Sequence, residues 1–176
     1  AGKWSSATGI TSDNACNGAC SAGKWSSATG IASDNDCNGA CSAGKWSTTT
    51  GINTEDDCSN NPCSQGKWSD ETGLSADSQC KHCSAGKWST ATGITSDDAC
   101  NGACSAGKWS TATGITSNDA CNRNCSAGKW STATGIATED DCNGVCSVGK
   151  WSDETGLSGD SQCKICERGK YNLDRR

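Results

Sequence analysis

The stretch CSAGKWSTATGITSNDAC, residues 104–121, contains the pattern that decides the fold. It begins and ends with cysteine and holds one Trp and one Ile among small, polar and turn-forming residues. The pattern recurs along the chain, and Tyr171 takes a ninth aromatic position after the eight tryptophans. Self-similarity at a period of 20–22 residues is typical of repeat proteins whose units pack on their neighbours. The tryptophans are Trp4, Trp25, Trp46, Trp68, Trp88, Trp109, Trp130 and Trp151.

The cysteine that precedes each Ser-x-Gly-Lys motif marks the start of a repeat. The divisions are a truncated first repeat at 1–19, repeats at 20–40, 41–62, 63–82, 83–103, 104–124, 125–145 and 146–165, and the start of a further, divergent repeat at 166–176. Segments 69–81 and 152–164 share Ser-Asp-Glu-Thr-Gly-Leu-Ser, which indicates a duplicated block of four repeats, 1–83 and 84–166. Because both ends fall inside the pattern, we expect the parent protein to continue in both directions.

The composition is that of a disulfide scaffold. Cysteine supplies 16 of 176 residues, apolar residues make up only 32%, and Phe and Met are absent. A chain this polar cannot bury an ordinary core, so covalent bridges formed in an oxidising, extracellular or cell-surface setting are predicted to stabilise it. The net charge of −5 is spread along the chain, which argues against a nucleic-acid partner. No apolar stretch is long enough to predict a membrane span in this segment.

The spacing of the cysteines predicts how they pair. The interval between some neighbours varies, whereas the longer interval is always 17 residues. A closed loop must keep its length to keep its geometry, so we pair the cysteines across the constant interval, and Cys16 and Cys166 then need partners outside the 176 residues. The alternative pairs close neighbours such as Cys16 and Cys20, and sequence alone leaves it open. The predicted bridges are Cys20–Cys37, Cys41–Cys58, Cys63–Cys80, Cys83–Cys100, Cys104–Cys121, Cys125–Cys142 and Cys146–Cys163.

Within a repeat, the residues predict short strands and turns with little regular secondary structure. Ser-x-x-Thr-Gly favours a turn, which we expect to join Lys-Trp-Ser and Ile-Thr as a hairpin. Ser/Thr followed by Asp/Glu predicts a single capped helical turn, and Asn-Gly-Ala predicts a tight turn into the next repeat. The eight tryptophans form a packing ladder with the Ile or Leu six residues later. We expect each Trp to pack on its own disulfide and each Lys stem to lie over a neighbouring ring.

The repeat resembles a known extracellular module. Cys-x-x-Gly-Lys-aromatic-Ser, as in 80–89, and the same motif without its Ser in 163–171, are similar to the ephrin-receptor-like cysteine-rich repeat, a relative of the cysteine-rich modules of tumour-necrosis-factor and growth-factor receptors. The resemblance covers essentially the whole chain and implies an elongated solenoid or rod of disulfide-bridged hairpins outside the cell. Long arrays of this kind occur in surface proteins of protists and algae.

Few residues are candidates for chemistry. One His and two distant Cys-x-x-Cys pairs do not predict a zinc site, a cofactor or a catalytic constellation. Acid clusters such as 55–57 and 139–141 leave weak calcium binding as an alternative to solvated, capped turns. Asn124 opens the one Asn-x-Ser/Thr sequon, and the Ser/Thr clusters are candidates for O-glycans. The recurring acids Asp70, Glu71, Asp153 and Glu154 are candidates for docking a periodic partner.

These observations predict a structural extracellular protein that forms rods or filaments in an appendage, sheath or matrix. Its expected partners are other protein subunits, through self-assembly or along a periodic filament. The alternative is a ligand-binding receptor or adhesin ectodomain, for which unit-specific residues such as His82, Arg123, Val145 and Ile165 would be the signal. A matrix protein that contacts ice or mineral through regularly spaced Thr is a third interpretation, which the turn-like Thr-Gly context disfavours.

Overall fold

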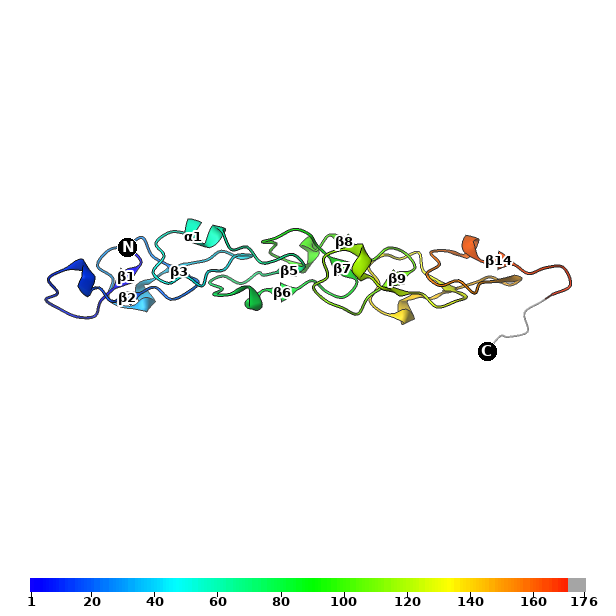
Figure 1. The fold of residues 1–176 in the computed structure, drawn as a ribbon, viewed down its shortest axis with the longest axis horizontal. Helices are drawn as coiled ribbons and strands as arrows, with labels where there is room; N and C mark the ends of the chain where they lie inside the picture. The colour runs from blue at the N-terminus through cyan, green and yellow to red at the C-terminus, as the bar shows by residue number, and fades with distance from the viewer. Residues whose placement is uncertain (171–176) are drawn as a thin grey trace. The chain divides into compact units, whose positions relative to one another are not determined.

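A computed structural model describes residues 1–170, and it consists of two-residue strands and single helical turns (Figure 1). The prediction of a small disulfide-rich repeat with short hairpins and little regular structure is confirmed. The strands are β1 Lys3–Trp4, β2 Gly18–Ala19, β3 Lys24–Trp25, β4 Gly39–Ala40, β5 Lys67–Trp68, β6 Lys81–His82, β7 Lys87–Trp88, β8 Gly102–Ala103, β9 Lys108–Trp109, β10 Arg123–Asn124, β11 Lys129–Trp130, β12 Gly144–Val145, β13 Lys150–Trp151 and β14 Lys164–Ile165. The helical turns are α1 Asp56–Ser59 and the 3-10 turns Asp13–Ala15, Asp34–Asp36, Asp77–Gln79, Asp97–Ala99, Asn118–Ala120, Glu139–Asp141 and Asp160–Gln162.

The contacts divide the chain into two compact units. The first contains Ala1–His82 and Ala91–Cys100, and the second contains Cys83–Thr90 and the described residues from Asn101 onward. Both units are built from the same repeat and use the same contacts between repeats.

The repeats form one antiparallel pair of short strands each, except that repeat 41–62 has only an isolated bridge between Lys45 and Pro62. The segments that pair are not the two that the sequence predicts. The Lys-Trp strand pairs with the strand just before the next repeat, as in Lys87 with Ala103, rather than with the nearer Ile-Thr segment. The predicted tight turn at Asn-Gly-Ala is therefore also wrong, because Gly102 lies in β8. In this repeat the Trp88 ring lies over Gly102, so a Cβ there would lie 2.2 Å from Cδ2 of Trp88. Other repeats carry Lys81 or Arg123 at the position opposite the Trp.

The apolar residue of each repeat belongs to the interface with the preceding repeat. Leu74 forms an isolated parallel bridge with Trp46, and the N–H of Ser47 donates to the carbonyl of Leu74 at 3.0 Å. The same bridge joins Trp130 to Leu157. This explains why Ile or Leu does not pair within its own hairpin: in the interior repeats its side chain helps to fill the small core between two repeats.

The disulfides join cysteines 17 residues apart. In six of the bridges the Cα–Cα distance lies between 5.5 and 5.9 Å, within the usual range. Cys83 and Cys100 are disulfide-bonded as well. The structure pairs Cys20–Cys37, Cys41–Cys58, Cys63–Cys80, Cys104–Cys121, Cys125–Cys142 and Cys146–Cys163.

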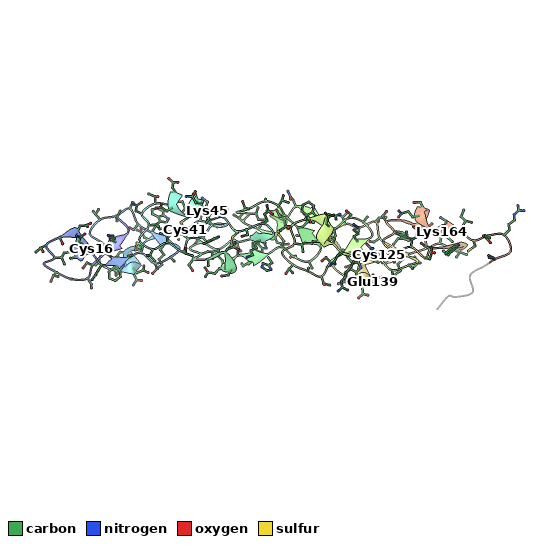
Figure 2. All side chains as sticks on the ribbon, in the orientation of Figure 1. Cys16, Cys41, Lys45, Cys125, Glu139 and Lys164 are labelled. Carbon is green, nitrogen blue, oxygen red and sulfur yellow. A yellow bond between two sulfur atoms is a disulfide. The ribbon has the colours of Figure 1, made fainter. Side chains whose placement is uncertain are left out.

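Each small core combines one bridge with side chains from two repeats. Figure 2 labels Cys41, whose bridge to Cys58 packs with Ile52 of its own repeat and with Trp25 of the repeat before. The expectation that each Trp packs on its own disulfide is therefore wrong. A two-residue strand that is closely followed by a turn places the ring at the border of its repeat, where the next bridge is the nearest apolar surface.

Five repeats also touch the repeat after next through a pair of glycines. Gly107 has a φ of +77°, and a Cβ on it would lie 2.3 Å from the carbonyl oxygen of Gly156. The N–H of Gly156 in turn donates to the carbonyl of Cys125 at 2.8 Å. Only glycine permits both the left-handed backbone and this approach. The other pairs are Gly2–Gly51, Gly23–Gly73, Gly44–Gly93 and Gly86–Gly135.

Candidate functional site

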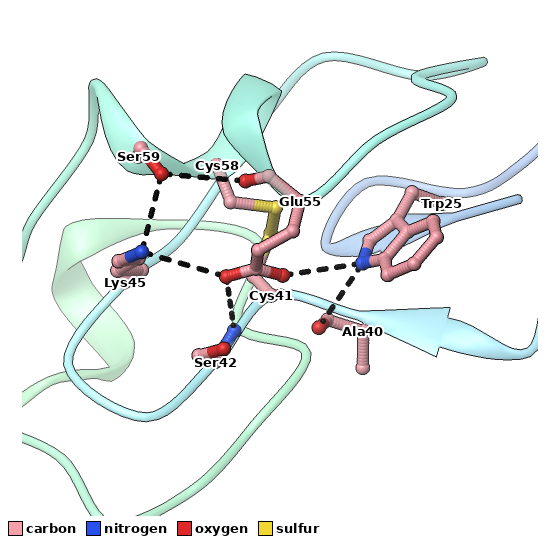
Figure 3. A network of polar contacts seen from close by, with 8 residues as sticks. All are labelled: Trp25, Ala40, Cys41, Ser42, Lys45, Glu55, Cys58 and Ser59. Carbon is pink, nitrogen blue, oxygen red and sulfur yellow. Dashed lines mark hydrogen bonds and ion pairs between the residues drawn. A yellow bond between two sulfur atoms is a disulfide. The ribbon is translucent and has the colours of Figure 1, made fainter. Parts of the chain in front are cut away.

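The densest polar network surrounds the carboxylate of Glu55, at the start of α1 (Figure 3). Its Oε2 accepts from the Nε1 of Trp25 at 3.2 Å, and its Oε1 accepts from the N–H of Ser42 at 3.1 Å. The Nζ of Lys45 lies 3.6 Å from Oε1 and donates to the Oγ of Ser59 at 3.1 Å. All polar atoms of the carboxylate thus bind groups of its own repeat and the preceding one.

The electrostatics of this network favour a permanently charged carboxylate. Partial burial raises the pKa of Glu55, but the hydrogen bonds from Ser42 and Trp25 and the charge of Lys45 outweigh it and lower the pKa. Glu139 repeats the arrangement, with Trp109 at 3.1 Å and Ser126 at 3.1 Å. A carboxylate whose pKa is lowered stays ionised at neutral pH, so it can accept these hydrogen bonds and link the two repeats.

Other repeats place an Asp at the same position. Asp160 binds the Nζ of Lys150 at 2.7 Å and the N–H of Ser147 at 2.7 Å. The hydrogen bond from Lys150 is the main cause that lowers the pKa of Asp160 to about 2. In repeat 104–124 the neutral Asn118 takes this place and accepts from the N–H of Ser105 at 2.9 Å. The feature common to these repeats is therefore an oxygen acceptor for the Ser that follows the bridge cysteine.

This arrangement bears on the proposed calcium sites. The last acid of the clusters at 34–36 and 139–141 accepts hydrogen bonds from the cap residue of its own turn, as in Thr138 Oγ1 to Asp141 at 2.9 Å. Among residues 1–170, His, Cys, Asp and Glu side chains do not gather in threes in a way that could hold a metal ion.

The candidate docking acids lie beside a lysine. Lys81 Nζ contacts Asp70 at 2.7 Å and Glu71 at 3.1 Å, and it lies 5.0 Å from the centroid of the Trp68 ring. Asp153 and Glu154 bind Lys164 in the same way. Both acids of each pair are well exposed, so the surface they offer to a partner is an ion-pair cluster with an excess of one negative charge.

The cation that covers a Trp ring is not the lysine that the sequence suggests. Lys24, next to Trp25, binds Asp34 at 2.9 Å instead of a ring. The stacked cations come from the strand before the next repeat, where Arg123 lies 4.9 Å from the centroid of Trp109. A strand neighbour faces the ring directly, whereas the Lys next to Trp points to the opposite side of the strand.

The remaining predicted positions are placed as follows. Asn124 lies exposed in β10, and its Nδ2 donates weakly to the Oγ1 of Thr155 at 3.5 Å. Its sequon includes Cys125, which is fully buried in a bridge. Cys16 and Cys166 are half-buried free thiols. The predicted aromatic position of Tyr171 lies outside the described residues.

Apart from Ile10, the large apolar residues that are exposed among residues 1–170 lie in repeats 125–145 and 146–165. Val145 is 65% exposed and Ile165 is 78% exposed. Both are named in the sequence analysis as residues that are specific to their repeats. The sequence analysis did not single out Val148, which is 85% exposed. Its signal is visible in the sequence, because the residue before Gly-Lys is Ala in most other repeats.

The structure also offers an open groove of about 540 Å³ lined by Gly30, Ile31, Asn35 and Asp36, but no basic or nucleophilic residue lines it. No helix in the described part of the chain is both long enough and apolar enough to cross a bilayer.

Comparison with known proteins adds no relative: no protein-family model matches the chain, and no curated protein sequence matches it. The resemblance to the ephrin-receptor-like repeat therefore stays a prediction.

Proposed function

We propose that the chain is a structural extracellular protein, a rod- or filament-forming component of a cell-surface appendage, sheath or matrix. Its disulfides, which are closely spaced and joined within single repeats, are typical of an oxidising, secreted setting. The assigned partners are other protein subunits of the same assembly.

The observation that carries this proposal is the use of the same contacts at successive repeats. The N–H of Ser47 donates to Leu74, and that of Ser131 donates to Leu157 at 3.2 Å, in different units of the chain. The glycine pairs recur in the same way, as in Gly23 with Gly73. Backbone contacts that recur so regularly between repeats give a shape that can be extended by adding further repeats.

Chemistry points the same way. The pKa values of carboxylates such as Glu55 and Asp160 are lowered by lysine, serine and tryptophan partners that belong to the scaffold. Perturbed groups at a catalytic centre normally face a cleft instead. A role in shape rather than in turnover accounts for every strong polar contact described above.

A second candidate, an adhesin or receptor ectodomain, is favoured by one observation. Val145, Val148 and Ile165 expose apolar side chains within two neighbouring repeats, where other repeats carry smaller or polar residues. Exposed apolar side chains that gather in this way are a feature of protein-binding surfaces.

Electron microscopy of the native material and of the purified chain tests the proposal. Filaments or sheaths with an axial periodicity that matches one repeat or one block of four repeats support it. Monodisperse particles that capture one soluble protein, and lose it when Val148 and Ile165 are both changed to Ser, would support the adhesin instead.

A further inference from the structure

The bridges determine which part of the chain carries tension. In repeat 104–124, the Cys104–Cys121 bridge encloses the 16 residues between its cysteines, and only three residues separate Cys121 from Cys125. A force applied along the chain therefore crosses the sulfur–sulfur bond and the short segment after it. The enclosed loop, with its Trp and Ile, lies outside the path of the force.

We propose that the array is a tether whose greatest length under tension is set by the redox state of its bridges. The inference rests on the proposed structural function, because only a load-bearing protein uses this property. It adds that the redox state of the bridges regulates the length of the chain under tension, which the structural function alone does not imply.

The lengths follow from the connectivity. With the bridge closed, one repeat spans at most 5.6 Å across the Cα atoms of Cys104 and Cys121 plus about 14 Å for the four chain steps to Cys125, or about 20 Å in all. With the bridge open, the 21 steps from Cys104 to Cys125 span about 74 Å. Each opened bridge therefore releases about 54 Å of chain.

Packing protects the closed state. Cys104 is fully buried, Cys121 is 2% exposed, and the equivalent Cys41–Cys58 bridge packs against Trp25 of the preceding repeat. A thiolate must approach a sulfur directly to exchange with it. The bridge consequently becomes accessible only when tension has separated the repeats and removed the covering Trp.

The chemical step needs a dithiol as reductant. A thiolate of the dithiol attacks one bridge sulfur, and the other cysteine leaves as a thiolate that takes up a proton. The second thiol of the dithiol then closes on the mixed disulfide and releases the first cysteine. Two electrons pass to the bridge, which yields two protein thiols and one oxidised dithiol.

Force spectroscopy on the full chain, held by tags at its two ends, tests the proposal. Without a reductant, we expect no step of about 54 Å at any force that leaves covalent bonds intact. With dithiothreitol present, steps of about 54 Å should appear, and only at forces that first separate the repeats.

Two variants provide matched controls. The double substitution Cys104→Ser and Cys121→Ser should add one extension of about 54 Å in the absence of reductant. Cys16→Ser, which removes a thiol that is free in the structure, should leave the traces unchanged.

Three results would overturn the inference. The first is a step of about 54 Å in the unsubstituted chain without reductant, and the second is reductant-dependent steps of only about 8 Å, the length that bridges between close cysteines would release. The third is reduction of the bridges in the unloaded chain as fast as in the chain under load. A chain that passes these tests but forms no filaments would support the tether and refute the proposed assembly. Failure of the inference and failure of the proposed function are therefore distinguishable.

Discussion

The contact between a repeat and the repeat after next is tested by changing one glycine to alanine. Gly107 and Gly128 occupy the same place in their repeats and have the same φ of +77°. A Cβ on Gly107 would lie 2.3 Å from the carbonyl oxygen of Gly156, whereas a Cβ on Gly128 has no described atom within 4 Å. The pair therefore separates the cost of a left-handed alanine from the cost of the clash.

The magnitudes can be worked out from this geometry. Alanine in the left-handed region costs about 1–2 kcal/mol in both variants. In Gly107→Ala, an ordinary contact of 3.4 Å requires Gly156 to move about 1 Å away from Gly107. The N–H of Cys125 holds that residue to the carbonyl of Gly107 at 2.9 Å, so the move also breaks the 2.8 Å hydrogen bond from the N–H of Gly156 to the carbonyl of Cys125. Loss of that bond adds about 1–3 kcal/mol, because both groups are then left without a partner.

Native-state hydrogen exchange and urea unfolding, both with the bridges intact, measure the two variants. We expect Gly107→Ala to lose about 2–5 kcal/mol and the protection of the Gly156 amide, and Gly128→Ala to lose about 1–2 kcal/mol with that amide still protected. Equal losses in the two variants would refute the claim that repeats two apart are in contact.

Three further predictions concern the core and the carboxylates. The side chain of Leu157 is 3% exposed, so Leu157→Ala should lower the free energy of unfolding in urea by about 2–5 kcal/mol. The equivalent side chain of Ile10 is 41% exposed, so Ile10→Ala should lower it by about 1 kcal/mol or less. Similar values for the two variants would contradict the core described here. Glu139→Ala removes one acceptor of the Trp109 Nε1 and should lower the free energy of unfolding by about 1 kcal/mol. Glu139→Gln keeps an oxygen at this place and should restore at least half of that loss. Equal stabilities of the Ala and Gln variants would count against the hydrogen bond. The ion pair with Lys150 lowers the pKa of Asp160 from 3.8 to about 2, so the folded state binds this proton less readily than the unfolded state. The melting temperature should therefore be highest above pH 4 and fall between pH 4 and pH 2, and the melting temperature of Asp160→Asn should fall less steeply. A melting temperature that is constant over this range would contradict the pairing.

The repeat and the class of fold could be predicted from the sequence because they depend on spacing. A Trp every 20–22 residues and a constant interval of 17 between cysteines describe closed loops of equal length, and Cys104 and Cys121 form such a loop. The single helical turn near the second cysteine was also predictable, because Ser or Thr followed by an acid is a local signal.

The partners of these elements could not be predicted, because the sequence does not show which repeats touch. Ile115 looks like the second strand of a local hairpin, yet it forms a bridge with Trp88 of the preceding repeat. Gly102 looks like a turn residue, yet it lies in β8 under the ring of Trp88. In each position the residue meets the requirement of a neighbour that is distant along the chain, and local propensity is identical for either role.

The candidate site shows the same limit. The acids at 55–57 are compatible with calcium when only the sequence is considered, and the structure shows that Glu55 is held by Trp25, Ser42 and Lys45. The Trp lies 30 residues away, so no local motif could reveal the contact.

Tryptic digestion without reduction, after denaturation and blocking of free thiols, tests most directly the claim that each repeat is closed by one bridge across 17 residues. Trypsin cuts after Lys3, Lys24, Lys45, Lys67 and Lys81, which divides 4–81 into four peptides. The bridges Cys20–Cys37, Cys41–Cys58 and Cys63–Cys80 should hold these peptides together as one covalent species in mass spectrometry. Separate peptides 4–24, 25–45 and 46–67, each with an internal bridge, would contradict it.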